Sequence, residues 1–169
     1  ANHIYITACG TSWHASLIGS YILEELLNVP VKVEYASEFR YRETAVNSDS
    51  VVICVSQSGE TADTLAAIRK AKENGALTMG IVNVVGSSIA RETHCGVYIH
   101  AGPEIGVAST KSFTAQVAIF NLIGILLAQK KNVNIDSINP LINDLEHLPG
   151  LIQSVLDCGN EIIPIAQDF

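Results

Sequence analysis

The stretch VVICVSQSGET, Val51–Thr61, joins a continuous apolar run to a loop of small polar residues. The run Val51–Val55 has no polar interruption, which is typical of a strand buried on both faces of a parallel sheet. The loop Ser56–Thr61 holds three hydroxyl residues, an amide and a glycine, and it leads into a segment with helical spacing. We therefore expect a strand, a polar loop and a helix in succession here.

The same succession recurs along the chain. Five short β-rich runs are Ile4–Cys9, Val31–Tyr35, Val51–Val55, Leu77–Val84 and Val97–His100. Segments with helical spacing separate or follow them, at 13–22, at 65–71 before a stop at Gly75, and at 109–129. This alternation predicts a three-layer α/β/α sandwich around a five-stranded parallel sheet, in the flavodoxin-like order 2-1-3-4-5.

The remainder of the chain has a different character. We assign residues 1–130 to the α/β domain and residues 131–169 to a helical tail. Within this tail, Leu141–Leu156 predicts one or two amphipathic helices, with Pro149-Gly150 as the break between them. Both ends of the sequence look cut from a longer protein.

Composition excludes several classes of function. The net charge of −7 argues against binding along a nucleic-acid backbone. The four cysteines lack zinc-ligand spacing, so we expect no metal, reduced thiols and a cytoplasmic setting, with Cys9 and Cys54 in the core. The most apolar stretch, Val117–Ala128, is too short to span a bilayer, so we expect no membrane.

Two polar loops follow the first and third predicted strands. They are Cys9–Ser12 and Ser56–Thr61, and each opens a helix. In the predicted order these strands are neighbours at the point where the strand order reverses, which is where such sheets bind ligands. Hydroxyls and free backbone N–H groups favour a phosphate at this position. The alternative is structural, with Ser58 as a helix cap and Gly59 in a turn.

The phosphate does not look like part of a nucleotide. The sequence has neither GxxxxGK[ST] nor GxGxxG, so a phosphosugar or similar metabolite is the better candidate. A third loop, Gly102–Lys111, could line the other side of the site, or serve only as a connector with Ser109 as N-cap. Lys111 opposes the helix dipole there, so Glu60, Glu104 or the ligand should offset it, unless the lysine is simply solvated.

Four motifs carry a family resemblance: CGTS at 9–12, SQSGETADTL at 56–65, NVVGSSIARE at 83–92 and EIGVASTKSFTAQ at 104–116. They resemble the glutamine–fructose-6-phosphate aminotransferase (isomerizing) family, also called glucosamine-6-phosphate synthases. SQSGET alone is typical of any sugar isomerase (SIS) domain, whereas EIGVASTK is more specific. The resemblance covers most of the chain and implies the SIS fold, as the first of two SIS subdomains.

The resemblance also implies roles for individual residues. Phosphate-binding positions of the family match Thr11, Ser12, Ser56, Gln57, Ser58 and Thr61, and positions at the sugar's hydroxyl end match Val107 and Ser109. The family's catalytic glutamate, histidine and lysine lie in the second subdomain and its tail. We therefore expect no catalytic residue in this fragment, and no cofactor.

The family's reaction supplies the expected ligands and partners. It converts fructose 6-phosphate and glutamine to glucosamine 6-phosphate and glutamate, in amino-sugar biosynthesis. This chain should bind fructose 6-phosphate or glucosamine 6-phosphate weakly and lack activity by itself. Its expected partners are a second copy in a homodimer, and the glutaminase and second SIS domains of the full-length protein.

Two other functions remain open. One is a SIS-type module that senses a sugar phosphate, although such a regulator usually carries a DNA-binding segment and this chain is acidic. The other is a stand-alone sugar-phosphate isomerase or deglycase. It would need its own carboxylate, and Glu104 is the loop glutamate placed to supply one.

Overall fold

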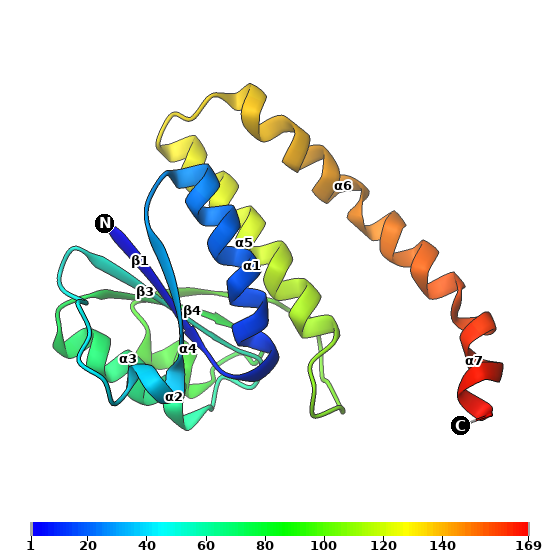
Figure 1. Ribbon diagram of the computed structural model, residues 1–169, viewed down its shortest axis with the longest axis horizontal. Coiled ribbons are helices and arrows are strands. Elements are labelled where there is room, and N and C mark those ends of the chain that lie inside the picture. Colours follow the sequence, from blue (N-terminus) through cyan, green and yellow to red (C-terminus); the bar gives the residue numbers. More distant parts are fainter. Residues whose placement is uncertain (1, 169) are drawn as a thin grey trace. The chain divides into compact units, whose positions relative to one another are not determined.

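A parallel sheet forms the centre of the structure, a computed structural model that describes residues 2–168 (Figure 1). Within these residues it has five strands in the order β2-β1-β3-β4-β5. Their bounds are β1 His3–Ala8, β2 Val31–Tyr35, β3 Ser50–Ser56, β4 Leu77–Val82 and β5 Cys95–Tyr98. The predicted α/β/α sandwich and its strand order are confirmed, and the reversal of strand order falls between β1 and β3.

Burial follows the position of each strand in the sheet. The central strands β1 and β3 are buried along almost their whole length, whereas β2 at the edge keeps only Glu34 buried. In register, Ala8 of β1 lies beside Val55 of β3. The two strands therefore end level with each other, and the chain leaves the sheet at neighbouring points.

Helices cover both faces of the sheet (Figure 1). One face carries α1 (Gly10–Leu27) and α5 (Lys111–Lys130), and the other carries α2 (Ala36–Phe39), α3 (Ala62–Glu73) and α4 (Ser88–Glu92). Gly19 of α1 faces the ring of Phe120 on α5, and an added Cβ there would lie 2.4 Å from the ring carbon Cγ. Only glycine leaves room for this fully buried ring without displacing it.

The helix α5 is long and apolar enough, by length and composition, to cross a membrane. A core helix passes the same test, and α5 has buried residues along its whole length that pack within the fold. Its buried face contacts α1, whereas Leu122, Leu126 and Leu127 are exposed.

The predicted boundaries need small corrections. β1 stops before Cys9, β4 stops at Val82 instead of Val84, and β5 lies two residues earlier than predicted. The long helix begins at Lys111, not Ser109, because Glu104 rather than Ser109 accepts its first N–H groups. Pairing along the sheet, not hydrophobicity alone, decides where a strand ends.

The predicted break at Pro149-Gly150 is wrong. One helix, α6, runs through Pro140 and Pro149 over Ile135–Asp157, and only then does α7 begin, over Gly159–Gln167. A proline removes one N–H donor, but Pro149 is exposed, so water can satisfy the carbonyl that loses its partner.

The chain divides into two compact units, and the boundary between them in the sequence falls between Ala128 and Gln129. The second unit consists of the end of α5 with α6 and α7, and most of its apolar side chains are exposed. The assignment of residues 131–169 to a tail that leads into a second SIS domain stays a prediction. Ala1 and Phe169, the ends of the two predicted segments, lie outside the described residues.

Candidate functional site

The loops after β1 and β3 enclose a cleft of about 250 Å³. The first loop enters α1 through Gly10, whose φ of 57° is left-handed. The second enters α3 through Gly59, at φ 69°. All eight residues predicted to bind ligand line this one cleft: Thr11, Ser12, Ser56, Gln57, Ser58, Thr61, Val107 and Ser109. Their role in binding stays a prediction.

Close packing fixes the shape of the second loop. A Cβ on Gly59 would lie 2.1 Å from the hydroxyl oxygen of Ser87, so no other residue fits there without movement. Within the loop, the Gly59 N–H donates to Ser56 Oγ at 3.0 Å, and the Glu60 N–H donates to Ser58 Oγ at 3.2 Å. The alternative role of Ser58 as cap of α3 is not what the structure has, since Thr61 is the N-cap residue.

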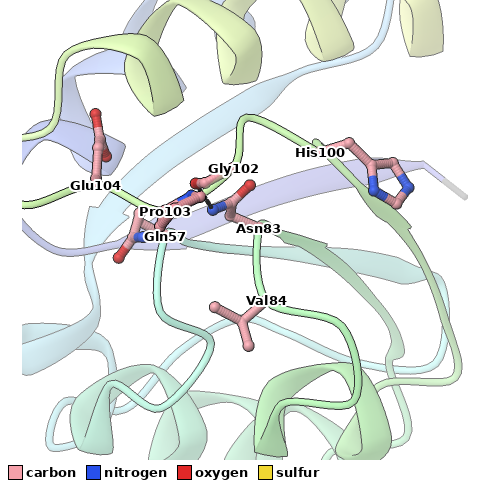
Figure 2. A pocket seen from close by; sticks show the side chains of 7 residues that line it. All are labelled: Gln57, Asn83, Val84, His100, Gly102, Pro103 and Glu104. Carbon is pink, nitrogen blue, oxygen red and sulfur yellow. Dashed lines mark hydrogen bonds between the residues drawn. The ribbon is translucent and has the colours of Figure 1, made fainter.

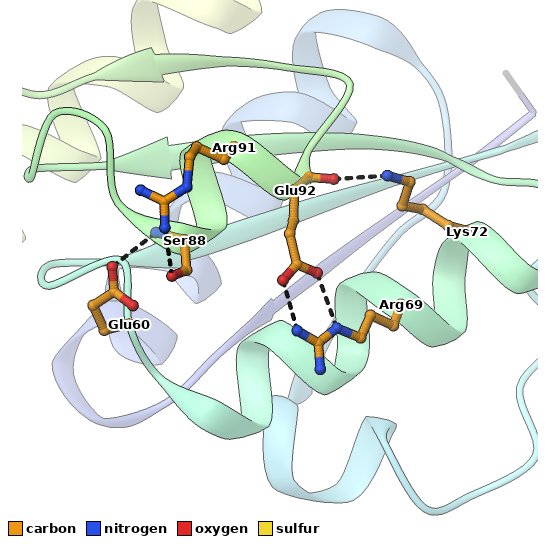
Figure 3. A network of polar contacts seen from close by, with 6 residues as sticks. All are labelled: Glu60, Arg69, Lys72, Ser88, Arg91 and Glu92. Carbon is orange, nitrogen blue, oxygen red and sulfur yellow. Dashed lines mark hydrogen bonds and ion pairs between the residues drawn. The ribbon is translucent and has the colours of Figure 1, made fainter.

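A network of polar contacts links this loop and α3 to α4 (Figure 3). Glu60 turns away from the cleft, and its carboxylate accepts a hydrogen bond from the Ser88 N–H at the start of α4, at 2.8 Å. Hydrogen bonds with Ser88 lower the pKa of Glu60. Farther along, Arg69 of α3 pairs with Glu92 of α4, with a shortest distance of 2.6 Å. Glu60 is therefore a structural anchor and does not offset Lys111.

The cleft itself is polar and carries no cationic side chain among the described residues that line it. Cys9 lines it as well and is only partly buried, but it also packs against the hydrophobic core, so its predicted core position holds in part. Its place just past the end of β1 leaves it half-buried. Burial raises the pKa of the Cys9 thiol, and the charge of Asp63 raises it further, so the thiol stays neutral at pH 7. The other predicted core cysteine, Cys54, is fully buried.

The third loop is anchored by Glu104. Its carboxylate accepts hydrogen bonds from Ser109 Oγ at 2.9 Å and from the Thr110 N–H at 2.7 Å, and it also caps the first turn of α5. Burial raises the pKa of Glu104, but the donors of Ser112, Thr110 and Ser109 outweigh this effect and lower the pKa to about 2. A carboxylate so bound is a poor proton acceptor, which disfavours Glu104 as the base of an isomerase.

Lys111 is exposed, in accord with its solvated alternative. Glu104 accepts backbone hydrogen bonds at the start of the same helix, so a negative charge already complements the helix dipole there. Of the groups predicted to offset Lys111, Glu104 is the one that lies at the start of α5.

A second cleft, of about 470 Å³, lies next to the first and shares Gln57 with it (Figure 2). Asn83, directly after β4, fixes its wall because its amide donates to the Gly102 carbonyl at 2.8 Å and accepts from the Ala101 N–H at 2.8 Å. His100 contributes to the lining from a left-handed backbone at φ 49°. This cleft was not predicted from the sequence, although Asn83 follows β4 much as Ser56 closes β3.

Within residues 2–168, no group of three or more His, Cys, Asp or Glu residues could hold a metal ion. His94 instead bonds to the main chain, through its Nδ1 and the Thr78 N–H at 3.0 Å.

The sequence of this chain matches a known domain family and several named proteins. The profile of the SIS domain family matches residues 1–126. Glutamine–fructose-6-phosphate aminotransferase [isomerizing] of Chlorobaculum tepidum is 55% identical over 166 residues, and that of Bacteroides thetaiotaomicron is 50% identical over 171 residues. These matches cover 98% and 100% of this chain, but only 27% and 28% of the two relatives.

A solved structure gives the same result. The C-terminal domain of glucosamine-fructose-6-phosphate aminotransferase from Francisella tularensis superposes with a TM-score of 0.91 at 40% identity. The match covers 99% of this chain and 47% of that one. The chain thus spans about a quarter of the curated relatives and about half of the solved C-terminal domain.

Proposed function

This chain belongs to the SIS domain family, and we propose that it is the phosphosugar-binding half of the isomerase region of a glutamine–fructose-6-phosphate aminotransferase. The observation that carries the proposal is the single cleft at the ends of β1 and β3, which all eight expected residues line. The names of the relatives indicate a sugar phosphate as the ligand, and the polar residues of the cleft are suited to bind its phosphate.

The phosphate is held by neutral donors. Ser12, Ser56 and Ser58 line one cleft, and the free N–H groups at the starts of α1 and α3 add two helix dipoles. Such donors favour a dianion without the strong attraction for other anions that a lysine cluster would give. Val107 and Ser109 lie on the third loop, where they reach the sugar's hydroxyl end.

The full reaction belongs to a longer protein. In this proposal, fructose 6-phosphate and glutamine give glucosamine 6-phosphate and glutamate, and the catalytic glutamate, histidine and lysine come from a second SIS domain and its tail. A glutaminase domain supplies ammonia. The assembly is a cytoplasmic homodimer, and this fragment by itself binds but does not turn over.

Neither competing function has an observation in its favour. A stand-alone isomerase or deglycase would need a free carboxylate, but Glu104 is held by several donors, with its pKa at about 2. A DNA-linked sensor would need a basic surface, and the chain has a net charge of −7.

The proposal is tested by titrating fructose 6-phosphate and fructose separately into the ¹⁵N-labelled chain. A half-site should bind at about millimolar affinity, because association costs offset much of the hydrogen bonding. We expect amide shifts in the loops at 10–12 and 56–61 with fructose 6-phosphate only. Equal shifts with both sugars would contradict a phosphate site.

A further inference from the structure

One buried side chain reaches the cleft loop from a remote part of the sequence. Gln116 lies on α5 and is fully buried, and its Nε2 donates a hydrogen bond to the hydroxyl oxygen of Ser12 at 3.0 Å. Ser12 is 5% exposed and lines the cleft, whereas Gln116 does not line it. Gln116 therefore acts on the cleft only through Ser12.

The contact has a consequence for the Ser12 proton. A serine hydroxyl has one proton to donate and two lone pairs that accept. Gln116 occupies a lone pair, and within residues 2–168 this is the one hydrogen bond recorded for Ser12 Oγ. The proton is then left for a group in the cleft.

The two serines of the loop after β3 offer a partial parallel. Ser56 Oγ accepts from the Gly59 N–H and also bonds to Thr61 Oγ1 at 3.0 Å, and Ser58 Oγ accepts from the Glu60 N–H. In both cases a backbone N–H of the serine's own loop occupies a lone pair. The loop of Ser12 makes no such bond to its hydroxyl, and a side chain from another helix provides the N–H in its place.

We propose that Gln116 is a positioning residue that turns the Ser12 hydroxyl into a donor toward an oxyanion in the cleft. The inference rests on the phosphate site proposed above. The opposite amide orientation would have the opposite effect. Gln116 Oε1, which has no hydrogen-bond partner within residues 2–168, would then accept the Ser12 proton and withhold it from the ligand.

The variant Gln116→Met separates the two orientations, since it keeps the length of the side chain and removes both polar atoms. Losing a positioned donor should weaken binding of fructose 6-phosphate about fivefold, the usual weight of one neutral hydrogen bond. Unchanged or tighter binding would overturn the proposal, because the proton of Ser12 would not have depended on Gln116.

A double-mutant cycle distinguishes positioning from packing. In a Ser12→Ala background, Gln116→Met should weaken binding no further, because the hydroxyl on which it acts is gone. An additional loss in that background would show a packing effect and overturn the inference. The matched control is Asn121→Leu, which removes another buried amide of α5, one that donates to the Val117 carbonyl of its own helix. It should leave binding unchanged.

A measurement on the unaltered chain covers the case in which Gln116→Met does not fold. The side-chain NH₂ resonances of Gln116 should shift with fructose 6-phosphate and with sulfate, but not with fructose. If the Ser12 amide shifts while the Gln116 NH₂ stays fixed, the coupling is refuted and the phosphate site stands. If neither anion shifts any resonance of the cleft loops, the proposed function itself fails, and this inference with it.

Discussion

The carboxylate of Glu104 accepts a hydrogen bond from the hydroxyl of Ser109 at 2.9 Å. The same carboxylate receives the first backbone N–H groups of α5, so one side chain fixes both a cleft residue and the start of a helix. The conformation of the third loop thus depends on the charge of Glu104, the residue that the sequence offered as a possible catalytic base.

That charge makes the loop sensitive to acid. The pKa of Glu104 falls from its ordinary 4.5 to about 2, despite partial burial, because several donors stabilise the carboxylate. Its folded pKa lies below its unfolded one, so its stabilisation is complete above pH 4.5 and is lost as the pH falls toward 2. Urea unfolding should show Glu104→Gln less stable by about 1 kcal/mol at pH 7, the weight of a helix cap.

The pH profile is the control for this prediction. The difference in stability between the wild-type chain and Glu104→Gln should stay constant above pH 5 and shrink at lower pH. A difference that does not change with pH would mean that the carboxylate contributes only through its shape.

Gly59→Ala should distort the phosphate loop. The substitution combines a left-handed backbone with a Cβ 2.1 Å from Ser87 Oγ, so it should cost more than the 1–2 kcal/mol expected, roughly, for a left-handed alanine alone. Gly86→Ala is the matched control, because φ is 73° there but the space is open. If urea unfolding shows the same loss of stability for Gly59→Ala and Gly86→Ala, the contact with Ser87 does not add to the cost.

A negative charge at the mouth of the phosphate cleft should prevent binding. Ser58→Asp removes a donor and repels a dianion, so amide shifts with fructose 6-phosphate should disappear. Ser58→Ala only removes the donor, so it should lower the affinity for fructose 6-phosphate about tenfold or more. Ser48→Asp makes the same change in net charge at the opposite end of β3. If Ser48→Asp weakens binding as much, the effect is one of overall charge and not of the cleft.

Two glycines at the contact between α1 and α5 should differ in how much stability is lost when each is replaced by alanine. Gly19→Ala forces a Cβ to 2.4 Å from the buried ring of Phe120, so thermal unfolding should show a loss despite the better helix propensity of alanine. Gly124→Ala is milder, because its nearest contact, at 2.7 Å, is the flexible end of Leu26. A ranking with Gly124→Ala worse would contradict the packing described here.

The sheet and the cleft loops could be predicted because their signals are local. The run Val51–Val55 indicates a buried strand by itself, and the polar residues after it lie at the carboxyl end of that strand in any parallel sheet. The loops after β1 and β3 lie together for the same reason, since the two strands are neighbours, whereas Val107 and Ser109 of the third loop were indicated only by the family resemblance.

The rest depends on contacts between residues distant in the sequence. Nothing near Gln116 indicates that its amide reaches Ser12, 104 residues earlier. Pro149 predicts a helix end by its chemistry, but the helix continues through it because the residue is exposed, and exposure is a property of the fold. Glu104 offered a carboxylate in a loop, and only the folded loop shows that its oxygens are already engaged.

A crystal structure of the chain soaked with fructose 6-phosphate tests the central claim most directly. The account predicts the phosphate oxygens within hydrogen-bond distance of the hydroxyls of Ser12 and Ser58, with the sugar extending toward Val107 and Ser109. A phosphate bound elsewhere, or one that contacts neither serine, would contradict it.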